Sequence, residues 1–253
     1  MDNYQLKKWY QTPWGILFAI LVALVVILLI LTLVWFGNLV NQVKNNRLGI
    51  IPDNLTPNAV NTIAVNNNNN NQNNPNRKIA EKNNRPFFGN KNAKLVVVEF
   101  GDFQCPYCAQ EFTVIREIMN KYKKDILFIY RDYPIINENS IPLTKYSLCA
   151  NEQGKYWQFF DKLYTNQNNI ASTSTIYKMA KESGLDINKL EICFNSDKYE
   201  QQIAENMSDA LTLGIDGTPT FFINGNKMAG PVPLKDWEQV ITKSLELLNN
   251  PIK

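Results

Sequence analysis

The pattern of hydrophobic and polar positions begins with a long apolar run near the N-terminus. Residues 16–36 contain no charged side chain. A helix over 14–35 would be about 31 Å long, which matches the ~30 Å hydrocarbon core of a bilayer. Trp14 and Trp35 lie at its two ends, as aromatic residues do at membrane interfaces.

This run predicts a signal anchor that spans the membrane at 14–37, with a cytoplasmic segment at 1–13. A cleaved signal peptide is the alternative, but its apolar region has only ~7–15 residues, and no A-x-A-like cleavage site follows the run here. Lysine and arginine are almost equally frequent on the two sides, so the positive-inside rule leaves the orientation open.

The chain then becomes polar. Residues 66–71 are consecutive asparagines, and further asparagines follow them, so the region 38–84 has little to bury. We expect a flexible linker here, with a root-mean-square span of roughly 35–40 Å. A passive spacer explains this composition as well as a specific role does.

A folded domain is predicted at 85–253. Residues 94–100 are almost continuously apolar and rich in valine, which is typical of a strand buried on both faces. Apolar residues recur at helical spacing from 109 to about 122. Cys105 and Cys108 lie where the strand gives way to the helix.

This position favours redox chemistry. Pro106 fits the first helical turn, so Cys105 is placed at a helix N-terminus, where unpaired N–H groups stabilise a thiolate. In Cys-x-x-Cys motifs the thiol pKa falls to about 3.5–7.5. Cys108, one turn further on, can resolve a mixed disulfide made by Cys105. Half of a zinc site is the competing interpretation of this spacing.

The composition excludes several other classes of chemistry. The chain has no histidine, which removes imidazole bases and histidine-ligated metals. The net charge is +3, but residues 1–78 carry +4 and residues 79–253 carry −1. The folded domain therefore has no basic excess that would bind nucleic acid.

Three blocks of sequence resemble the DsbA-like thioredoxin-fold disulfide oxidoreductases. The resemblance extends over about 86–250, and three blocks in family order are more specific than a Cys-x-x-Cys motif alone. The blocks read VVEFGDFQCPYC at 97–108, LCANEQGKYW at 148–157 and GIDGTPTFFING at 214–225.

The resemblance implies an α/β, thioredoxin-like fold with an inserted helical subdomain at about 137–213. The residues support a hairpin independently, because Asn224-Gly225 between two apolar runs is a strong turn signal. The expected strands lie at 94–100, 126–133, 220–223 and 227–228, and the expected core helices lie at 105–122 and 234–248.

The resemblance also implies a substrate-binding region. Pro219 would be a cis-proline that faces the redox pair, and Thr218 would offer its backbone to an extended peptide. An ordinary trans proline is the alternative. Pro106 and Tyr107, between the two cysteines, are further candidate substrate contacts. Strongly oxidising family members carry histidine in this dipeptide, so Tyr107 predicts a weaker oxidant with a higher Cys105 pKa.

Glu99 is an acid inside an otherwise apolar strand. Its burial is costly unless it is protonated or paired. In the resembling family the matching acid lies beneath the resolving cysteine and relays its proton. We therefore expect a raised pKa for Glu99 and proton transfer with Cys108. A surface carboxylate on an edge strand is the alternative.

Cys149 and Cys193 form the second cysteine pair. They are 44 positions apart, each among apolar neighbours, and Cys149 is expected just before a helix. We predict a structural disulfide, and two buried free thiols are the alternative. The even number of cysteines and this disulfide are typical of an oxidising compartment.

These features predict a single-pass cell-membrane enzyme whose catalytic domain is extracytoplasmic and exchanges disulfides with cysteine-containing secreted or surface proteins. No metal and no cofactor beyond the redox-active disulfide is expected. The resemblance suggests re-oxidation by a quinone-linked membrane partner, either DsbB-like or similar to vitamin-K-epoxide reductase. The alternatives are a disulfide isomerase or reductase, a non-catalytic metal-binding module of four cysteines, and a tethered binding domain without catalysis.

Overall fold

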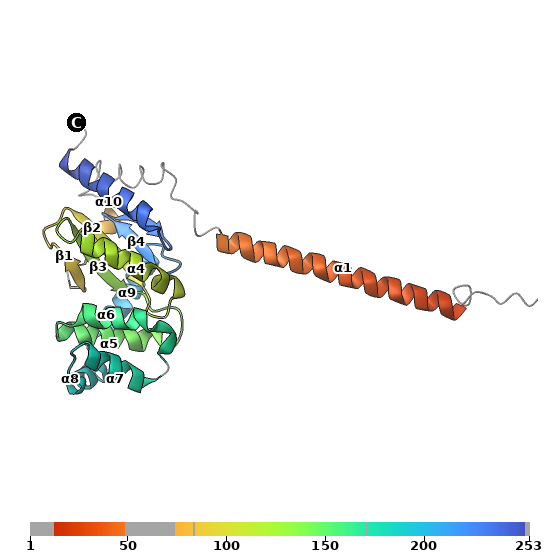
Figure 1. Ribbon diagram of the computed structural model, residues 1–253, viewed down its shortest axis with the longest axis horizontal. Helices are drawn as coiled ribbons and strands as arrows, with labels where there is room; N and C mark the ends of the chain where they lie inside the picture. The colour runs from red at the N-terminus through yellow and green to blue at the C-terminus, as the bar shows by residue number, and fades with distance from the viewer. Residues whose placement is uncertain (1–12, 49–73, 83, 171, 251–253) are drawn as a thin grey trace, which may run out of the picture. The chain divides into compact units, whose positions relative to one another are not determined.

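The computed structural model describes residues 13–48, 74–82, 84–170 and 172–250 (Figure 1). The chain consists of two units, Met1–Ile50 and Ile51–Lys253. Apart from residue 13, the predicted N-terminal segment lies outside the described residues, as does the asparagine tract.

The first unit contains helix α1, Pro13–Leu48. The large apolar side chains described between Ile20 and Val34 are exposed, by 44% to 70% of their area. Among the residues that the structure describes, no helix has the length and hydropathy required of a membrane span.

We expected a linker from residue 38 onward, but α1 continues through 38–48. No proline interrupts these residues, and proline is the residue that most strongly breaks a helix. The asparagines in this segment have only a weakly unfavourable helix propensity, so they do not end the helix.

The second unit contains a five-stranded sheet with the order β1-β3-β2-β4-β5. Strands β2 and β3 are parallel, while β4 runs antiparallel to β2 and β1 runs antiparallel to β3. The strands are β1 Phe87–Gly89, β2 Leu95–Gly101, β3 Ile126–Asp132, β4 Thr220–Ile223 and β5 Asn226–Ala229. The four strands expected in the thioredoxin core are thus confirmed to within two residues.

Helices cover both faces of the sheet. One face packs against α4 and α10, and the other packs against α9 and α3. Between β3 and α9 the chain forms the helical insertion, in which α5 packs against α6 and α8 (Figure 1). The bounds are α3 Pro75–Ala80, α4 Pro106–Lys121, α5 Ser140–Glu152, α6 Tyr156–Thr165, η2 Gln167–Asn169, α7 Thr173–Glu182, α8 Ile187–Phe194, α9 Glu200–Thr212 and α10 Leu234–Asn249.

Strand β2 lies in the middle of this core, and all seven of its residues are buried. Val97 packs with the α4 and α10 side, whereas Val96 and Val98 pack with the α9 and α3 side. Because successive side chains of a strand point to opposite faces, a strand covered on both faces must be apolar throughout. This is the physical origin of the nearly continuous apolar sequence.

The predicted start of the domain at residue 85 is also wrong. Helix α3 belongs to the folded domain, and its Ala80 is fully buried. Arg131 on β3 is fully buried, donates to the carbonyl of Ile79 and pairs with Asp209 on α9 at 2.6 Å. A buried guanidinium needs such acceptors, and α3 supplies one of them.

Candidate redox site

Cys105 is the N-cap residue of α4, and Pro106 occupies the first position of the helix. The loop before it is held by Asp102, whose carboxylate accepts from the backbone N–H groups of Gln104, Ile135 and Ile136 at 2.8 to 2.9 Å. The backbone N–H of Cys105 donates to the Asp102 carbonyl at 3.0 Å. Asp102 therefore fixes the turn that leads from β2 into the helix.

The cis-proline segment lies against this helix start. The Thr218–Pro219 peptide bond is cis. The Cys105 thiol donates to the Thr218 carbonyl, with Sγ and O 3.1 Å apart. The sheet register explains the proximity, because β4 begins at Thr220, opposite Phe100 near the end of β2. The structure thus brings together Cys105, Thr218 and Pro219.

The pKa of Cys105 is lowered to about 6. The largest cause is a hydrogen bond from the Cys108 thiol, and the Thr218 side chain and the backbone N–H groups of Cys108 and Tyr107 act in the same direction. Burial opposes them. Donors directed at sulfur favour the thiolate, which is the nucleophilic form.

We expect this shift to appear in alkylation kinetics. In the reduced full-length chain in detergent, the rate of Cys105 alkylation by iodoacetamide should rise with pH around a midpoint near 6. It should then reach a plateau, since the thiolate is by then fully formed. Peptide mapping by mass spectrometry assigns the modified cysteine. A midpoint near the ordinary ~8.5 of a free cysteine would contradict the lowered pKa.

Cys108 has the opposite electrostatic environment. Its pKa is raised well above the usual value, mainly by burial and then by the neighbouring Cys105. Cys108 is therefore a protonated thiol while Cys105 is a thiolate. One sulfur is ready to attack, and the other holds a proton that must leave before it can react.

Glu99 is buried on β2, with 1% of its surface exposed, and is not an edge-strand surface residue. Its pKa is raised well above the usual value by burial, then by Glu111 and by Cys105. In the described part of the chain its Oε2 has no hydrogen-bond partner. Tyr130 lies opposite in the sheet register, and its hydroxyl is 2.7 Å from that of Tyr164.

Pro106 and Tyr107, the two residues between the cysteines, are exposed, and Tyr107 exposes 48% of its surface. Their side chains are therefore accessible beside the buried sulfurs.

The carbonyl of Cys105 accepts from Gln167 Nε2 at 2.9 Å, and the same nitrogen donates to the Phe103 carbonyl. Gln167 lies in the insertion, and no sequence signal marked it.

Sequence reasoning also missed Glu111, a buried acid on α4 that interacts with Glu99. Its position three residues after Cys108 on a largely apolar helix face was an available signal, of the same kind that identified Glu99. Asp102 was part of the quoted motif, but its role in holding the loop depends on the backbone of residues 135 and 136, which the motif does not contain.

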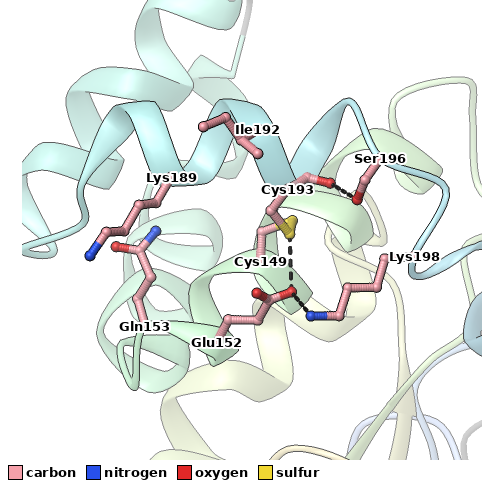
Figure 2. A pocket seen from close by; sticks show the side chains of 8 residues that line it. All are labelled: Cys149, Glu152, Gln153, Lys189, Ile192, Cys193, Ser196 and Lys198. Carbon is pink, nitrogen blue, oxygen red and sulfur yellow. Dashed lines mark hydrogen bonds and ion pairs between the residues drawn. A yellow bond between two sulfur atoms is a disulfide. The ribbon is translucent and has the colours of Figure 1, made fainter.

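The structure joins Cys149 and Cys193 in a disulfide between α5 and α8. Cys149 lies inside α5 and does not precede a helix as expected, because α5 ends only at Glu152. The disulfide borders a cavity of about 570 Å³, and Figure 2 shows Glu152 and Lys198 beside it. The residues that line this cavity all belong to the insertion, and none of them belongs to the redox motif.

This disulfide separates the four cysteines into two pairs, so a site made of all four thiolates does not form in this structure. Among the described residues, no group of three or more acidic or cysteine side chains is placed to hold a metal ion.

The two cysteine thiols at the start of α4 have pKa values shifted in opposite directions, and they face a cis-proline. This arrangement characterises the thiol–disulfide oxidoreductases of thioredoxin fold. Comparison with known proteins gives the same class. A thioredoxin family model matches residues 81–243, and the chain belongs to this family. Its structural relatives place it among the DsbA-like disulfide oxidoreductases.

Two solved structures illustrate this similarity. A thioredoxin-like oxidoreductase from Silicibacter pomeroyi DSS-3 is 26% identical, with a TM-score of 0.60 over 67% of this chain and 97% of that one. The α-DsbA1 protein of Wolbachia pipientis is 25% identical, with a TM-score of 0.61 over 68% of this chain and 96% of that one.

Curated sequences give a partial match of another kind. A protein of Mycolicibacterium vanbaalenii named Na(+)/H(+) antiporter NhaA 1 is 30% identical over 147 residues, which are 56% of this chain and 24% of that protein. The chain thus spans about a quarter of the length of the curated relatives it matches.

Proposed function

We propose that the chain is a membrane-anchored, extracytoplasmic enzyme that exchanges disulfides with cysteine-containing secreted or surface proteins through Cys105-Pro106-Tyr107-Cys108. The observation that carries this proposal is the position of the Cys105 sulfur. It lies at a helix N-terminus, 3.1 Å from the carbonyl that precedes the cis-proline, with its pKa lowered to about 6.

The oxidised enzyme acts in two displacements. A substrate thiolate attacks Cys105 Sγ, the bond between Cys105 and Cys108 breaks, and Cys108 leaves with the electron pair. A second substrate thiolate then attacks the substrate sulfur and releases Cys105 as a thiolate. The substrate loses two electrons, and the cysteine pair gains them.

Proton transfer accompanies the first displacement. The departing Cys108 thiolate takes a proton from Glu99, because Cys108 has a raised pKa and favours the thiol. Glu99 is suited to hold that proton, since burial raises its own pKa. In the reverse direction the Glu99 carboxylate accepts the proton of Cys108.

Glu99→Gln keeps the shape of the side chain but removes the transferable proton. We expect the rate of thiol exchange to fall about 100-fold, in the range of general acid–base catalysis, and the pH dependence due to Glu99 to disappear. Stopped-flow tryptophan fluorescence with a cysteine peptide measures both. Glu117→Gln on the exposed side of α4 is the matched control and should be unchanged. A wild-type rate and pH profile for Glu99→Gln would remove the proton relay.

The substrate is proposed to lie along the cis-proline segment. The Thr218 carbonyl accepts only from the protonated Cys105 thiol, so it is free to bind an extended peptide once Cys105 is a thiolate or is bonded to substrate sulfur. The exposed Pro106 and Tyr107 border the same position. Anchoring by residues 14–37 is proposed from their uncharged, apolar sequence.

The reduction potential is the experiment that tests the direction of exchange. The potential is to be measured for the full-length chain in detergent against glutathione, with Cys105→Ser as the control that has no redox pair. Tyr107 stands where strongly oxidising family members carry histidine, so we expect this chain to be a weaker oxidant than they are. Its reduction potential should lie between that of DsbA, about −120 mV, and that of thioredoxin, about −270 mV. No two-electron equilibrium between the two sulfurs would refute the proposed function.

A value near that of thioredoxin together with activity on scrambled disulfides would favour the isomerase or reductase. An oxidising value favours the oxidase, which requires re-oxidation by an electron acceptor.

We propose a quinone-linked membrane partner, DsbB-like or similar to vitamin-K-epoxide reductase. Oxygen uptake by membranes in the presence of reduced enzyme and quinone measures this step.

A further inference from the structure

Glu111 is a second buried acid close to the redox pair. It lies on α4, one turn beyond Cys108, with 1% of its surface exposed. Both of its oxygens accept hydrogen bonds: Oε1 from the indole N–H of Trp237 at 2.6 Å and Oε2 from the backbone N–H of Val232 at 2.9 Å. Glu111 thus connects the redox helix to α10 and to the loop that precedes it.

Glu99 is the neighbouring carboxyl group, and its environment differs. The repulsion by Glu111 is the largest cause, after burial, of the raised pKa of Glu99. Yet Oε2 of Glu99 has no partner among the described residues, whereas both oxygens of Glu111 are occupied by donors. The geometry links the two acids: Phe221 pairs with Glu99 in the sheet register and packs edge-on against Trp237, the donor to Glu111, with ring centroids 4.9 Å apart. Both acids are buried, but the hydrogen bonds that stabilise them differ.

Two carboxyl groups in one apolar space do not both ionise readily, because like charges repel and burial disfavours each charge. A carboxylate that accepts two N–H donors keeps its charge more easily than one that accepts fewer. Such a pair loses its two protons in separate steps. When one proton remains, burial and hydrogen-bond donors around each carboxyl group decide which of the two holds it.

We propose that Glu111 and Glu99 form a buried carboxyl pair that holds a single proton, and that Glu111 is a positioning residue that keeps this proton on Glu99, beside Cys108. The inference rests on the proposed thiol–disulfide exchange, in which Glu99 supplies the proton to Cys108. It adds to that function a residue that never touches the substrate.

The surrounding groups are consistent with this assignment. Glu111 is bound by Trp237 from α10 and by Val232 from the preceding loop, while Glu99 interacts with Cys105 and Cys108 of α4. The phenols of Tyr130 and Tyr164 also interact with Glu99, and burial raises their pKa values, so they stay neutral. The pKa of Glu111 itself is raised to about 7 by burial, and its two hydrogen bonds oppose that rise.

The sign of the effect follows from the charge. Above about pH 7 Glu111 is ionised, and its negative charge holds the proton on Glu99. If Glu111 carried no charge, Glu99 would lose its proton at a lower pH. The pH range in which Glu99 can supply a proton to Cys108 would then shrink at its alkaline end.

Glu111→Gln in the full-length chain tests the inference. Infrared difference spectra between each chain and its Glu99→Gln counterpart isolate the protonated carboxyl band of Glu99 as a function of pH. We expect Glu111→Gln to lower the titration midpoint of Glu99 by at least about one pH unit, because one buried like charge is removed. Glu117→Gln, an exposed acid of the same helix, should leave it unchanged.

A double variant separates electrostatics from structure. In the Glu99→Gln background, adding Glu111→Gln should leave the pH profile of thiol exchange unchanged, since no proton remains to be held. An equal change of that profile with and without Glu99 would show a merely structural role and overturn the inference, as would an unmoved Glu99 midpoint.

The wild-type chain gives a second readout that does not depend on folding of a variant. Its protonated carboxyl bands should disappear in two separate steps, with Glu111 first near pH 7. A single step shared by both acids would also overturn the inference. Because these titrations need no turnover, they remain interpretable if the thiol exchange assay shows that the proposed function is wrong.

Discussion

Replacement of Cys108 by serine should stop turnover and trap Cys105 in a mixed disulfide with its substrate. Cys105 remains nucleophilic, because the serine hydroxyl can donate the hydrogen bond that the Cys108 thiol provides as the largest cause of the low Cys105 pKa. No second sulfur is then available to resolve the intermediate. We expect multiple-turnover exchange to fall at least about 1,000-fold, as when one member of a catalytic unit is lost.

Non-reducing gels and mass spectrometry of the trapped species measure this result. Cys108→Ala is the matched control, since it also removes the resolving sulfur but provides no donor. Its Cys105 alkylation midpoint should lie at a higher pH than that of Cys108→Ser. Turnover by Cys108→Ser within tenfold of wild type would show that the second sulfur is dispensable.

Removal of the Cys149–Cys193 disulfide should destabilise the fold more than any other change proposed for this chain. The bond closes a loop of 44 positions. The chain-entropy model assigns a loop of this size about 3 to 4 kcal/mol of stabilisation. We expect Cys149→Ala/Cys193→Ala to lower the free energy of unfolding by that amount. Alanine is preferred to serine because Cys149 is buried and a hydroxyl there would lack a partner.

Urea denaturation measures this difference, and activity per folded molecule should be unchanged because no residue of the redox motif lines the disulfide cavity. Reduction of the wild-type disulfide, followed by alkylation of the freed thiols, gives a comparison without mutation. A loss of less than about 1 kcal/mol would mean that the insertion is held by packing alone.

The core of the fold could be predicted because its signals are local. Strand β2 is covered on both faces and therefore reads as an uninterrupted apolar segment. The hairpin at Asn224-Gly225 requires left-handed backbone at both residues, with φ of 47° and 82°, which asparagine and glycine adopt readily. The Cys-x-x-Cys spacing requires only one helical turn.

Features that depend on distant contacts could not be predicted in this way. Helix α3 has only six residues, three of them polar, and its place in the domain depends on Arg131, some fifty positions away. The buried Glu111 is stabilised by donors from Val232 and Trp237, 121 and 126 positions later in the chain. Neither pairing leaves a periodic pattern in the sequence.

The way the chain enters the domain bears on which molecules the enzyme can reach. At the start of α3, Asn76 donates to the carbonyl of Gly225 at 3.2 Å. That hairpin lies beside the beginning of β2, whereas Cys105 follows its end, so the reactive sulfur occupies the opposite pole from the attachment point. A polypeptide can therefore approach Cys105 without meeting the segment through which the chain enters the domain.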